Sequence, residues 1–282
     1  MGLLEKVCYL GDDSIDRAAI YLAGIMTHYG IDFDHIDSDK SPSDHFTDQN
    51  YSLYIISDYP SKMFRNGQME HIAQSVEKEG SGLLMLGGWE SFHGRLGEYQ
   101  DSPLVPVLPV QMLNSDDRRN FSLPLIVRPS KQHPILGDLP WQNPSAVGGI
   151  NEFCAKKGAQ IILEGIAFDI RILDENVVDC SESNFCNIDG NAVVDQVTIP
   201  TAFGDSFAVR PVRRYPLLVV DKYGSGRTAA FASDVAPHWV GGFVDWGKKR
   251  LFQNVGDGFI EVGEDYAQFF RNLILWTGKL GI

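Results

Sequence analysis

The stretch Leu83-Leu84-Met85-Leu86-Gly87-Gly88-Trp89-Glu90-Ser91-Phe92-His93-Gly94 decides the fold class of this chain. Four consecutive apolar residues are typical of a strand that is buried on both faces, as in a parallel sheet. We expect Gly87 and Gly88 to end that strand in a sharp turn with positive φ, because glycine adopts this conformation without strain. The side chains that follow would then stand at the edge of the sheet, where α/β proteins place their functional loops.

Similar patterns occur on the amino-terminal side of this stretch. Short apolar runs alternate with stripes of apolar residues at helical spacing, and two glycines end the helical stripes. We expect strands at 7–10, 31–36 and 53–56, and helices at 15–29 and 69–76. Asp13 or Ser14 is expected to cap the first helix. The alternation predicts an α/β fold with a doubly wound, mostly parallel sheet and helices on both faces.

The carboxyl-terminal part is less regular. We expect strands at 121–127, 161–163, 217–221 and 228–231, a hairpin turn at 223–226 and a final helix over 266–277. The region 169–205 has little periodicity and is interpreted as an inserted region of loops and short strands. Because no linker is evident, residues 1–282 are expected to form a single domain.

The composition limits the function classes. Of the 282 residues 44% are hydrophobic, a globular composition that excludes disorder of the chain as a whole. The formal charge is −13. Such a charge disfavours nucleic acid and anionic membranes, so neither partner is expected. No apolar run approaches the roughly 20 residues of a membrane span, and no signal peptide is visible, so we expect a cytoplasmic protein. Residues 1–60 contain eleven acidic and three basic residues, so this segment carries −8 of the total charge.

Metal and cofactor motifs are weak. The four cysteines, Cys8, Cys154, Cys180 and Cys186, are too scattered for a disulfide framework or a zinc site and are expected to be free thiols. Asp12 and Asp13 follow the first strand and Asp58 follows the third, so three carboxylates could converge on Mg²⁺, as in response-regulator receivers. We favour helix capping and turn formation for these residues, and expect no metal and no cofactor.

Two loops after strands carry candidate catalytic residues. In the first, Ser91 resembles a nucleophile, with His93 or a distant histidine as its base. The alternative is that Trp89 and Phe92 simply fill the core beneath a tight turn. In the second, Asp234 could orient His238, and a carboxylate beside an imidazole raises its base strength. The alternative there is local capping by Asp234 and a surface position for the histidine.

Several ordered motifs resemble an uncharacterised family of class-I glutamine-amidotransferase-like proteins. They are Leu86-Gly87-Gly88-Trp89-Glu90-Ser91-Phe92, Tyr99, Leu108-Pro109-Val110, His133-Pro134-Ile135, Gly149-Ile150-Asn151, Tyr223-Gly224-Ser225-Gly226-Arg227, and Ser233-Asp234 with Pro237-His238-Trp239. The resemblance implies a flavodoxin-like sheet with a site at the strand ends. Enzymes of that class carry a cysteine on the turn after the fourth strand, and this chain has none there. A thiolate must attack the glutamine carboxamide, so we expect Cys-dependent amidotransferase activity to be absent.

Two functional hypotheses follow. The first is a binding protein that holds a small polar ligand, such as a sugar or another metabolite. Its crevice would be lined by Gly87, Gly88, Trp89, Glu90, Ser91, His93, Asp234, His238 and Trp239. The second is a hydrolase that uses Ser91 or a water activated by His238 and Asp234. This second hypothesis requires the Ser91 hydroxyl to lie within hydrogen-bond reach of His238 or His93.

A further expectation concerns association between copies of the chain. Homo-oligomerisation is plausible by analogy of fold, and the late aromatic residues Trp239, Phe243, Trp246 and Phe252 could form an interface or a lid. Ordinary core packing is the preferred interpretation for at least half of them.

Overall fold

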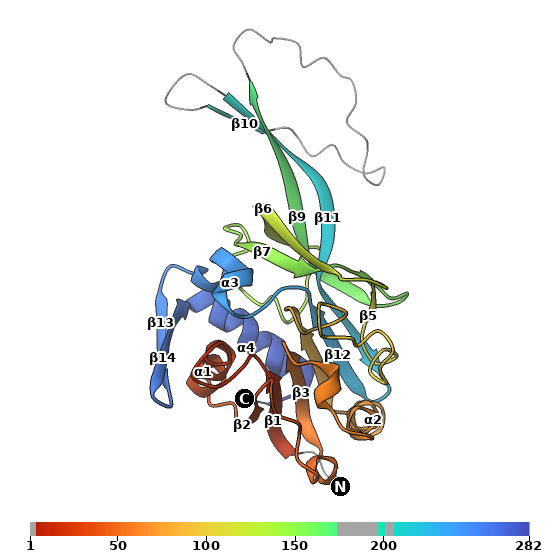
Figure 1. Ribbon diagram of the computed structural model, residues 1–282. Helices are drawn as coiled ribbons and strands as arrows, with labels where there is room; N and C mark the ends of the chain where they lie inside the picture. Colours follow the sequence, from red (N-terminus) through yellow and green to blue (C-terminus); the bar gives the residue numbers. More distant parts are fainter. Residues whose placement is uncertain (1–3, 174–196, 201–205, 282) are drawn as a thin grey trace.

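The computed structural model describes residues 4–173, 197–200 and 206–281. A ten-stranded sheet runs through this part of the chain in the order β2-β1-β3-β4-β12-β11-β9-β6-β7, with β10 paired to β11 (Figure 1). Its strands are β1 (Leu4–Gly11), β2 (Phe33–Ile36), β3 (Tyr51–Ser57), β4 (Gly82–Leu86), β6 (Arg118–Pro129), β7 (Ala146–Asn151), β9 (Gln160–Leu173), β10 (Val197–Pro200), β11 (Ser206–Tyr223) and β12 (Gly226–Phe231).

The direction of the strands divides this sheet into two parts. Strands β2, β1, β3, β4 and β12 run parallel to one another. Strands β11, β9, β6, β7 and β10 extend the sheet through antiparallel pairings. The α/β class that the sequence predicts is confirmed. The parallel part has the strand order of a flavodoxin-like fold, in which ligands bind where the order reverses, between β1 and β3.

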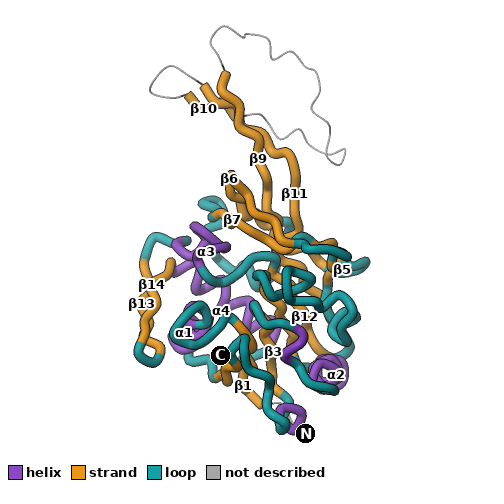
Figure 2. Tube along the Cα trace, in the orientation of Figure 1, coloured by secondary structure: helices purple, strands orange, loops and turns teal. Residues whose placement is uncertain are grey.

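Helices cover both faces of the parallel part (Figure 2). They are α1 (Ile20–His28), α2 (Gln68–Gln74), which continues into a π-helical turn η3 (Ser75–Glu79), and α4 (Glu264–Gly278). The short α3 (Pro237–Val240) lies beside β7 in the antiparallel part. A Cβ on Gly82 would lie 2.3 Å from Thr277 O in α4, whereas one on Gly226 would lie 2.6 Å from Val76 in η3. Arg227 pairs with Gly82 on the neighbouring strand, so the adjacent residue Gly226 faces the side of the sheet opposite to Gly82. Helix α4 and the turn η3 therefore lie on opposite faces of the sheet.

Helix α1 begins later than the sequence pattern predicts. Its N-cap is Ala19, which makes no side-chain capping bond, so the expected cap at Asp13 or Ser14 is wrong. The backbone of Asp13 has φ 63°, a left-handed conformation that turns the chain, and the Ser14 hydroxyl donates to Asp16. The expected stop at Gly30 is confirmed, because this residue has φ 66° directly after the last helical turn.

Two small antiparallel sheets lie outside the main one among the described residues, and the hydrophobic pattern of the sequence did not predict them. They are β5 (Val110–Met112) with β8 (Phe153–Ala155), and β13 (Arg250–Val255) with β14 (Gly258–Gly263). The second sheet packs on α1, where a Cβ on Gly24 would lie 2.6 Å from the Ile260 side chain. Of the late aromatic residues, Trp239, Phe243 and Trp246 belong to the buried interior, whereas Phe252 on β13 is 63% exposed.

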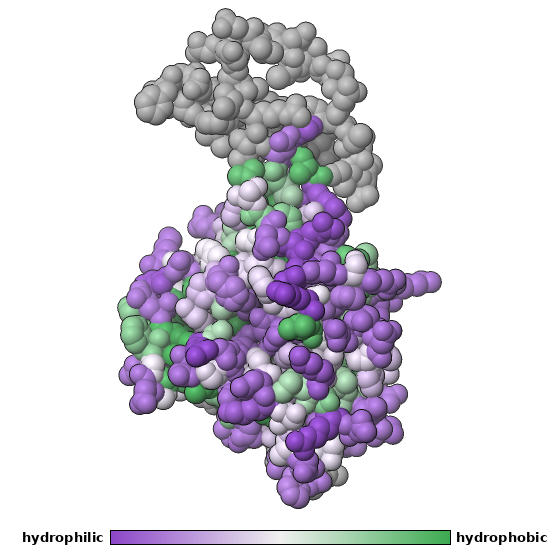
Figure 3. All heavy atoms as spheres, viewed as in Figure 1, coloured by the Kyte–Doolittle hydropathy of each residue, from purple (hydrophilic) through white to green (hydrophobic). Residues whose placement is uncertain are grey.

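Strands β9 and β11 form a long antiparallel arm that projects from the body (Figure 1). The body itself presents a largely hydrophilic face in Figure 3. Most of the region 169–205, including Cys180 and Cys186, lies outside the described residues, so the interpretation as an insertion stays a prediction. Cys8 and Cys154 are free thiols, the first buried and the second exposed. Among the helices of the described residues, none has the length and apolar character needed to cross a membrane.

Candidate functional site

A pocket of about 520 Å³ lies at the carboxyl ends of the parallel strands. Asp12 follows β1, Asp58 follows β3, and Trp89 and Glu90 follow β4. The full lining consists of Asp12, Asp13, Ala18, Ser38, Asp39, Asp58, Pro60, Lys62, Met63, Trp89 and Glu90. Five of these residues are acidic and one is basic. The acidic segment 1–60 of the sequence therefore supplies most of the charge of one concave surface.

The backbone at this end of the sheet is strained. Asp12, Asp13 and Asp58 all have positive φ, at 55°, 63° and 42°. A Cβ on Gly11 would lie 1.5 Å from Ser57 O, so the ends of β1 and β3 approach too closely for any side chain there. Strained backbone of this kind occurs preferentially at functional sites, where the surrounding structure maintains it.

Asp12 and Asp58 are buried carboxyl groups with raised pKa values. The Tyr9 hydroxyl donates to Asp12 Oδ2, yet burial still raises the pKa of Asp12 to about 6. Oδ1 of Asp58 accepts the backbone N–H of Glu90 at 2.7 Å. Burial, together with the charge of Asp12, raises the pKa of Asp58 to about 7. Near neutral pH, this pair of carboxyl groups therefore exists partly protonated and partly ionised.

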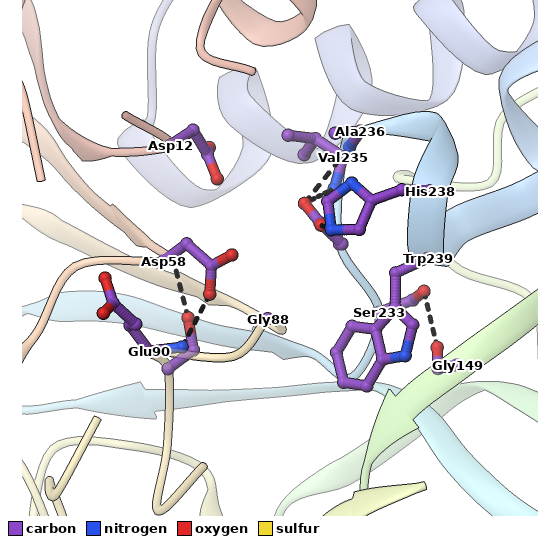
Figure 4. A network of polar contacts seen from close by, with 12 residues as sticks. Asp12, Asp58, Gly88, Glu90, Gly149, Ser233, Val235, Ala236, His238 and Trp239 are labelled. Atoms are coloured by element: carbon purple, nitrogen blue, oxygen red, sulfur yellow. Dashed lines mark hydrogen bonds and ion pairs between the residues drawn. The ribbon is translucent and has the colours of Figure 1, made fainter. Parts of the chain in front are cut away.

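Asp234, after β12, is a third buried carboxyl group, close enough to Asp12 and Asp58 for their charges to act on it. Figure 4 shows Asp12 and Asp58 on one side of this region and Val235, Ala236 and His238 on the other. Its Oδ1 accepts the N–H groups of Val235 at 2.5 Å and Ala236 at 3.1 Å. Burial and then the charges of Asp12 and Asp58 raise its pKa well above the usual range. Sequence reasoning placed Asp13 in this set instead, but the Asp13 carboxylate pairs with Arg17 at 3.0 Å.

The predicted contact between Asp234 and His238 is present. Asp234 Oδ2 lies 3.2 Å from His238 Nε2, and the His238 side chain is 58% exposed. Oδ2 makes no well-directed hydrogen bond within the described residues. Burial lowers the pKa of His238, while that of Asp234 is raised. Both shifts disfavour the charged forms that an ion pair requires, and the pKa of His238 is lowered rather than raised beside the carboxyl group, contrary to the expectation from the sequence.

The two glycines after β4 are required for a different reason from the expected one. Neither Gly87 nor Gly88 has positive φ, so the expectation of a left-handed turn here is wrong. Both positions are crowded instead. A Cβ on Gly87 would lie 2.2 Å from Ala232 O, and one on Gly88 would lie 2.0 Å from Asp58 Oδ1.

The loop after β4 is held by Asn151 and Asp117, which the sequence analysis did not assign to the site. The Asn151 side chain accepts the Gly88 N–H at 2.8 Å and donates to the Gly88 carbonyl at 3.1 Å. It also donates to Asp117 at 2.7 Å. Asp117 in turn accepts the N–H groups of His93 and Gly94, both at 3.0 Å. Only the three-dimensional fold brings these distant residues together, although Asn151 stands within one of the family motifs.

Ser91 lies in the interior of this loop. Its side chain is fully buried, and its Oγ accepts the backbone N–H of Asp58 at 2.9 Å. Within the described residues Ser91 makes no hydrogen bond to His93 or His238. His93 Nδ1 is also buried and has no hydrogen-bond partner in that part of the chain. The described contacts of Ser91 thus join the loop after β4 to the end of β3.

The two tryptophans predicted to flank a ligand have different environments. Trp89 is 45% exposed and lines the pocket, with the guanidinium of Arg118 4.6 Å above its ring. Trp239 is 4% exposed, and its indole N–H donates to Asn120 at 2.6 Å. Gly149 leaves room for that indole, since a Cβ there would lie 1.7 Å from Trp239 Nε1. Trp89 therefore supplies exposed aromatic surface to the pocket.

The described residues contain no cluster of three or more His, Cys, Asp or Glu side chains with a geometry suited to a metal ion. Asp12, Asp58 and Asp234 influence one another electrostatically, but their oxygens are not gathered around one point as ligands. We therefore treat these groups as hydrogen-bonding and proton-carrying carboxyls.

The fold, with its pocket at the ends of β1, β3 and β4, is that of a glutamine-amidotransferase-like α/β protein. A protein-family model described as "Putative glutamine amidotransferase" matches residues 31–173 and 164–261. This match covers well over half of the sequence, so the chain belongs to that family.

Two solved structures, both described as cytoplasmic proteins of Salmonella typhimurium and one of them from strain LT2, resemble this chain throughout. Each has a TM-score of 0.65 and 22% identity and covers 96% of this chain, with 98% and 99% of their own lengths matched. Similarity at this level of identity establishes a shared fold. No curated protein matches the sequence.

Proposed function

We propose that this protein binds a small polar ligand, a sugar or another polyol, in the pocket at the ends of β1, β3 and β4. The observation that carries the proposal is the combination of Asp12, Asp58 and Glu90 with the exposed ring of Trp89 around one pocket of about 520 Å³. Pockets of this size accommodate small ligands, with a few polar groups that fix orientation.

The protonation of the carboxyl pair suits hydroxyl groups. The pKa values of Asp12 and Asp58, about 6 and about 7, leave both protonated and ionised carboxyls present near neutral pH. A protonated carboxyl donates a hydrogen bond and an ionised one accepts, and adjacent hydroxyls of a polyol require both. A purely cationic ligand would be best served by fully ionised carboxylates.

Trp89 supplies the apolar side of the same pocket. Arg118 lies over one face of its ring and is itself held by Asp116 at 2.6 Å, which restricts the movement of the indole. The C–H face of a sugar ring packs on such an indole while its hydroxyls meet carboxyl groups. In this proposal Ser91 is a positioning residue, which joins Asp58 to the loop that carries Trp89 and Glu90.

Calorimetric titration of the purified protein with a panel of sugars, sugar alcohols and primary amines tests the proposal. We expect at least one polyol to bind, and Asp58→Asn and Trp89→Ala each to weaken it about tenfold. Asp257→Asn, an exposed position in the β13–β14 turn, and Phe252→Ala, an exposed aromatic on β13, are matched controls. If only amines bind, or if the controls weaken binding as much as the pocket variants, the proposal is wrong.

A hydrolase is the second candidate, favoured by the contact between Asp234 and His238. The imidazole is uncharged near neutral pH and more than half exposed, so it can accept a proton from a water molecule. Ser91 makes no hydrogen bond to His93 or His238 within the described residues, so the requirement set above for a serine nucleophile is not met. This route uses water as the nucleophile and leaves Ser91 in its positioning role. Assays with nitrophenyl esters and nitrophenyl glycosides test it. Turnover that falls at least a hundredfold in His238→Ala supports hydrolysis, whereas turnover that is unchanged contradicts it.

We further propose a cytoplasmic location. The absence of a membrane-spanning helix among the described residues and the description of the two structural relatives as cytoplasmic proteins support it. Fractionation of cells that express the tagged protein at natural levels would test the location. Recovery mainly in the membrane fraction would contradict it.

A further inference from the structure

A second pocket, of about 760 Å³, is lined by the His133-Pro134 part of a family motif that the proposed site does not use. It shares no lining residue with the pocket at the strand ends. Its apolar lining residues are Pro129, Pro134, Leu136 and Trp141. Its polar lining residues include Lys131 and His133, so the pocket combines apolar surface with basic side chains.

Hydrogen bonds within the segment that forms this pocket, and one bond to α4, fix its conformation. The Asn272 side chain, on α4, donates to Ile135 O at 3.1 Å. The Leu136 N–H donates to His133 O at 2.9 Å, and the Trp141 indole donates to Leu136 O at 3.2 Å. The pocket is therefore preformed, which lowers the entropic cost of binding a ligand there.

His133 has a defined orientation in this pocket. Its Nδ1 accepts the Ile135 N–H at 3.3 Å, which places the proton of the neutral ring on Nε2. The ring meets Trp276 edge-on at 4.8 Å. Nε2 makes no hydrogen bond to the described residues, so its N–H is available as a donor.

The charges around His133 favour an anion. Burial, and then the positive charges of Arg227 and Lys131, lower the pKa of His133. Lys131 is exposed and forms no ion pair within the described part of the chain, and Arg227 stacks over Trp276 at 4.9 Å. Asp138 is the one carboxylate among the lining residues, all of which are described, and it opposes these cations. The charges of Lys131 and Asp138 balance within the lining, and Arg227 beside His133 adds one positive charge, in contrast with the total of −13.

We propose that this second pocket binds a small organic anion. The charged group of the anion accepts hydrogen bonds from Lys131 Nζ and His133 Nε2–H, and its apolar part packs on Trp141 and the two prolines. An oxyanion accepts hydrogen bonds from ammonium and imidazole donors more strongly than neutral acceptors do. A bound anion also favours the charged form of His133, so binding is expected to take up protons. The positive charges of Arg227 and Lys131 oppose this protonation. The negative charge of Asp138 acts in the same direction as the anion.

The test uses phenyl phosphate, which has a doubly charged oxyanion on a flat apolar ring, in calorimetric titrations of the full chain. Benzyl alcohol serves as the uncharged probe of similar shape. We expect phenyl phosphate to bind and benzyl alcohol not to bind at the same concentrations. Lys131→Gln should weaken phenyl phosphate about fivefold and His133→Gln about tenfold. Lys78→Gln removes the same charge from an exposed position on η3, on the opposite face of the sheet, and should have no effect.

The outcomes separate clearly. Equal binding of benzyl alcohol, no binding of phenyl phosphate at millimolar concentration, or equal weakening by Lys78→Gln and Lys131→Gln each overturns the proposal. Lys131 is exposed, so its variant keeps the test valid even if His133→Gln fails to fold. Because the second pocket is separate from the strand-end pocket, either site can be disproved while the other stands.

Discussion

The carboxylate of Asp58 occupies the space that any side chain at residue 88 would need. A Cβ on Gly88 would lie 2.0 Å from Asp58 Oδ1, and that same oxygen accepts the N–H of Glu90 at 2.7 Å. The end of β3 and the loop after β4 are therefore fitted to each other at this point. Gly88 is needed for the Asp58 side chain, and Asp58 is needed for the conformation of the loop.

Gly88→Ala should reduce the free energy of unfolding by about 1–3 kcal/mol, because the added methyl group displaces the Asp58 carboxylate. Urea denaturation measures the loss. Gly242→Ala is the matched control, since a Cβ at that position meets no atom within 4 Å. In an Asp58→Ala background the loss caused by Gly88→Ala should shrink clearly, because the opposing group is gone. An equal loss in both backgrounds would show that the clash is with another part of the structure.

The stability of the protein should fall as the pH rises from about 4 to about 7. Burial raises the pKa of Asp12 to about 6 and of Asp58 to about 7, so the folded state binds protons that the unfolded state has already released. Stability linked to these groups is therefore present at low pH and is lost as the pH passes the folded-state pKa values.

Asp58→Asn should flatten this dependence and stabilise the protein by about 1–3 kcal/mol at about pH 8, since it removes the cost of a buried charge. Urea denaturation of both proteins at about pH 5 and about pH 8 provides the comparison. Asp257→Asn, at an exposed position, should leave the slope as in the unaltered chain. A variant slope as steep as that of the unaltered chain would contradict the role given to Asp58.

Asn151→Asp should destabilise the protein by about 3 kcal/mol or more at neutral pH. The substitution replaces an amide donor by a carboxylate that faces Asp117 and the Gly88 carbonyl in a fully buried position. Thermal and urea denaturation measure the effect, and Asn143→Asp at an exposed position is the control. The loss should become smaller at about pH 5, where the new carboxyl is protonated. A loss independent of pH would argue for a purely steric cause.

The chain should release no ammonia from glutamine above the rate without protein. No cysteine stands in the loop after β4, and burial raises the pKa of the Cys8 thiol, so it does not supply a thiolate. A coupled assay for ammonia measures the activity over a range of glutamine concentrations. Glutamine-dependent release that disappears in Cys8→Ser or in Cys154→Ser would refute this prediction.

The fold could be predicted from the sequence wherever the hydrophobic periodicity is strong. The buried runs that became β1, β3 and β4 and the stripe of α4 follow directly from which residues avoid water. The hairpin between β11 and β12 follows from its turn residues, and Tyr223 pairs with Gly226 across it. The start of α1 was predicted wrongly, because local capping preferences at Asp13 and Ser14 gave way to the left-handed turn at the end of β1.

The site was only partly readable. Strand ends and turn residues indicated the loop 87–94 and the pair of Asp234 and His238. The partners of that loop, Asn151 and Asp117, were not identifiable, since pairing between residues far apart in the chain leaves no periodic signal. The same reason explains why Trp89 and Trp239, equally plausible in sequence, differ so much in exposure.

The sequence by itself determined the α/β class, the parallel strands, the acidic character of the first 60 residues and the lack of a cysteine after β4. These properties depend on residue type and spacing alone. Only the tertiary structure decided which carboxyl groups meet, that Ser91 is buried against the backbone of Asp58, and that Gly88 makes room for the Asp58 side chain. The physical reason is that pKa values, crowding and hydrogen-bond partners depend on distances between strands, and those distances exist only once the sheet has formed.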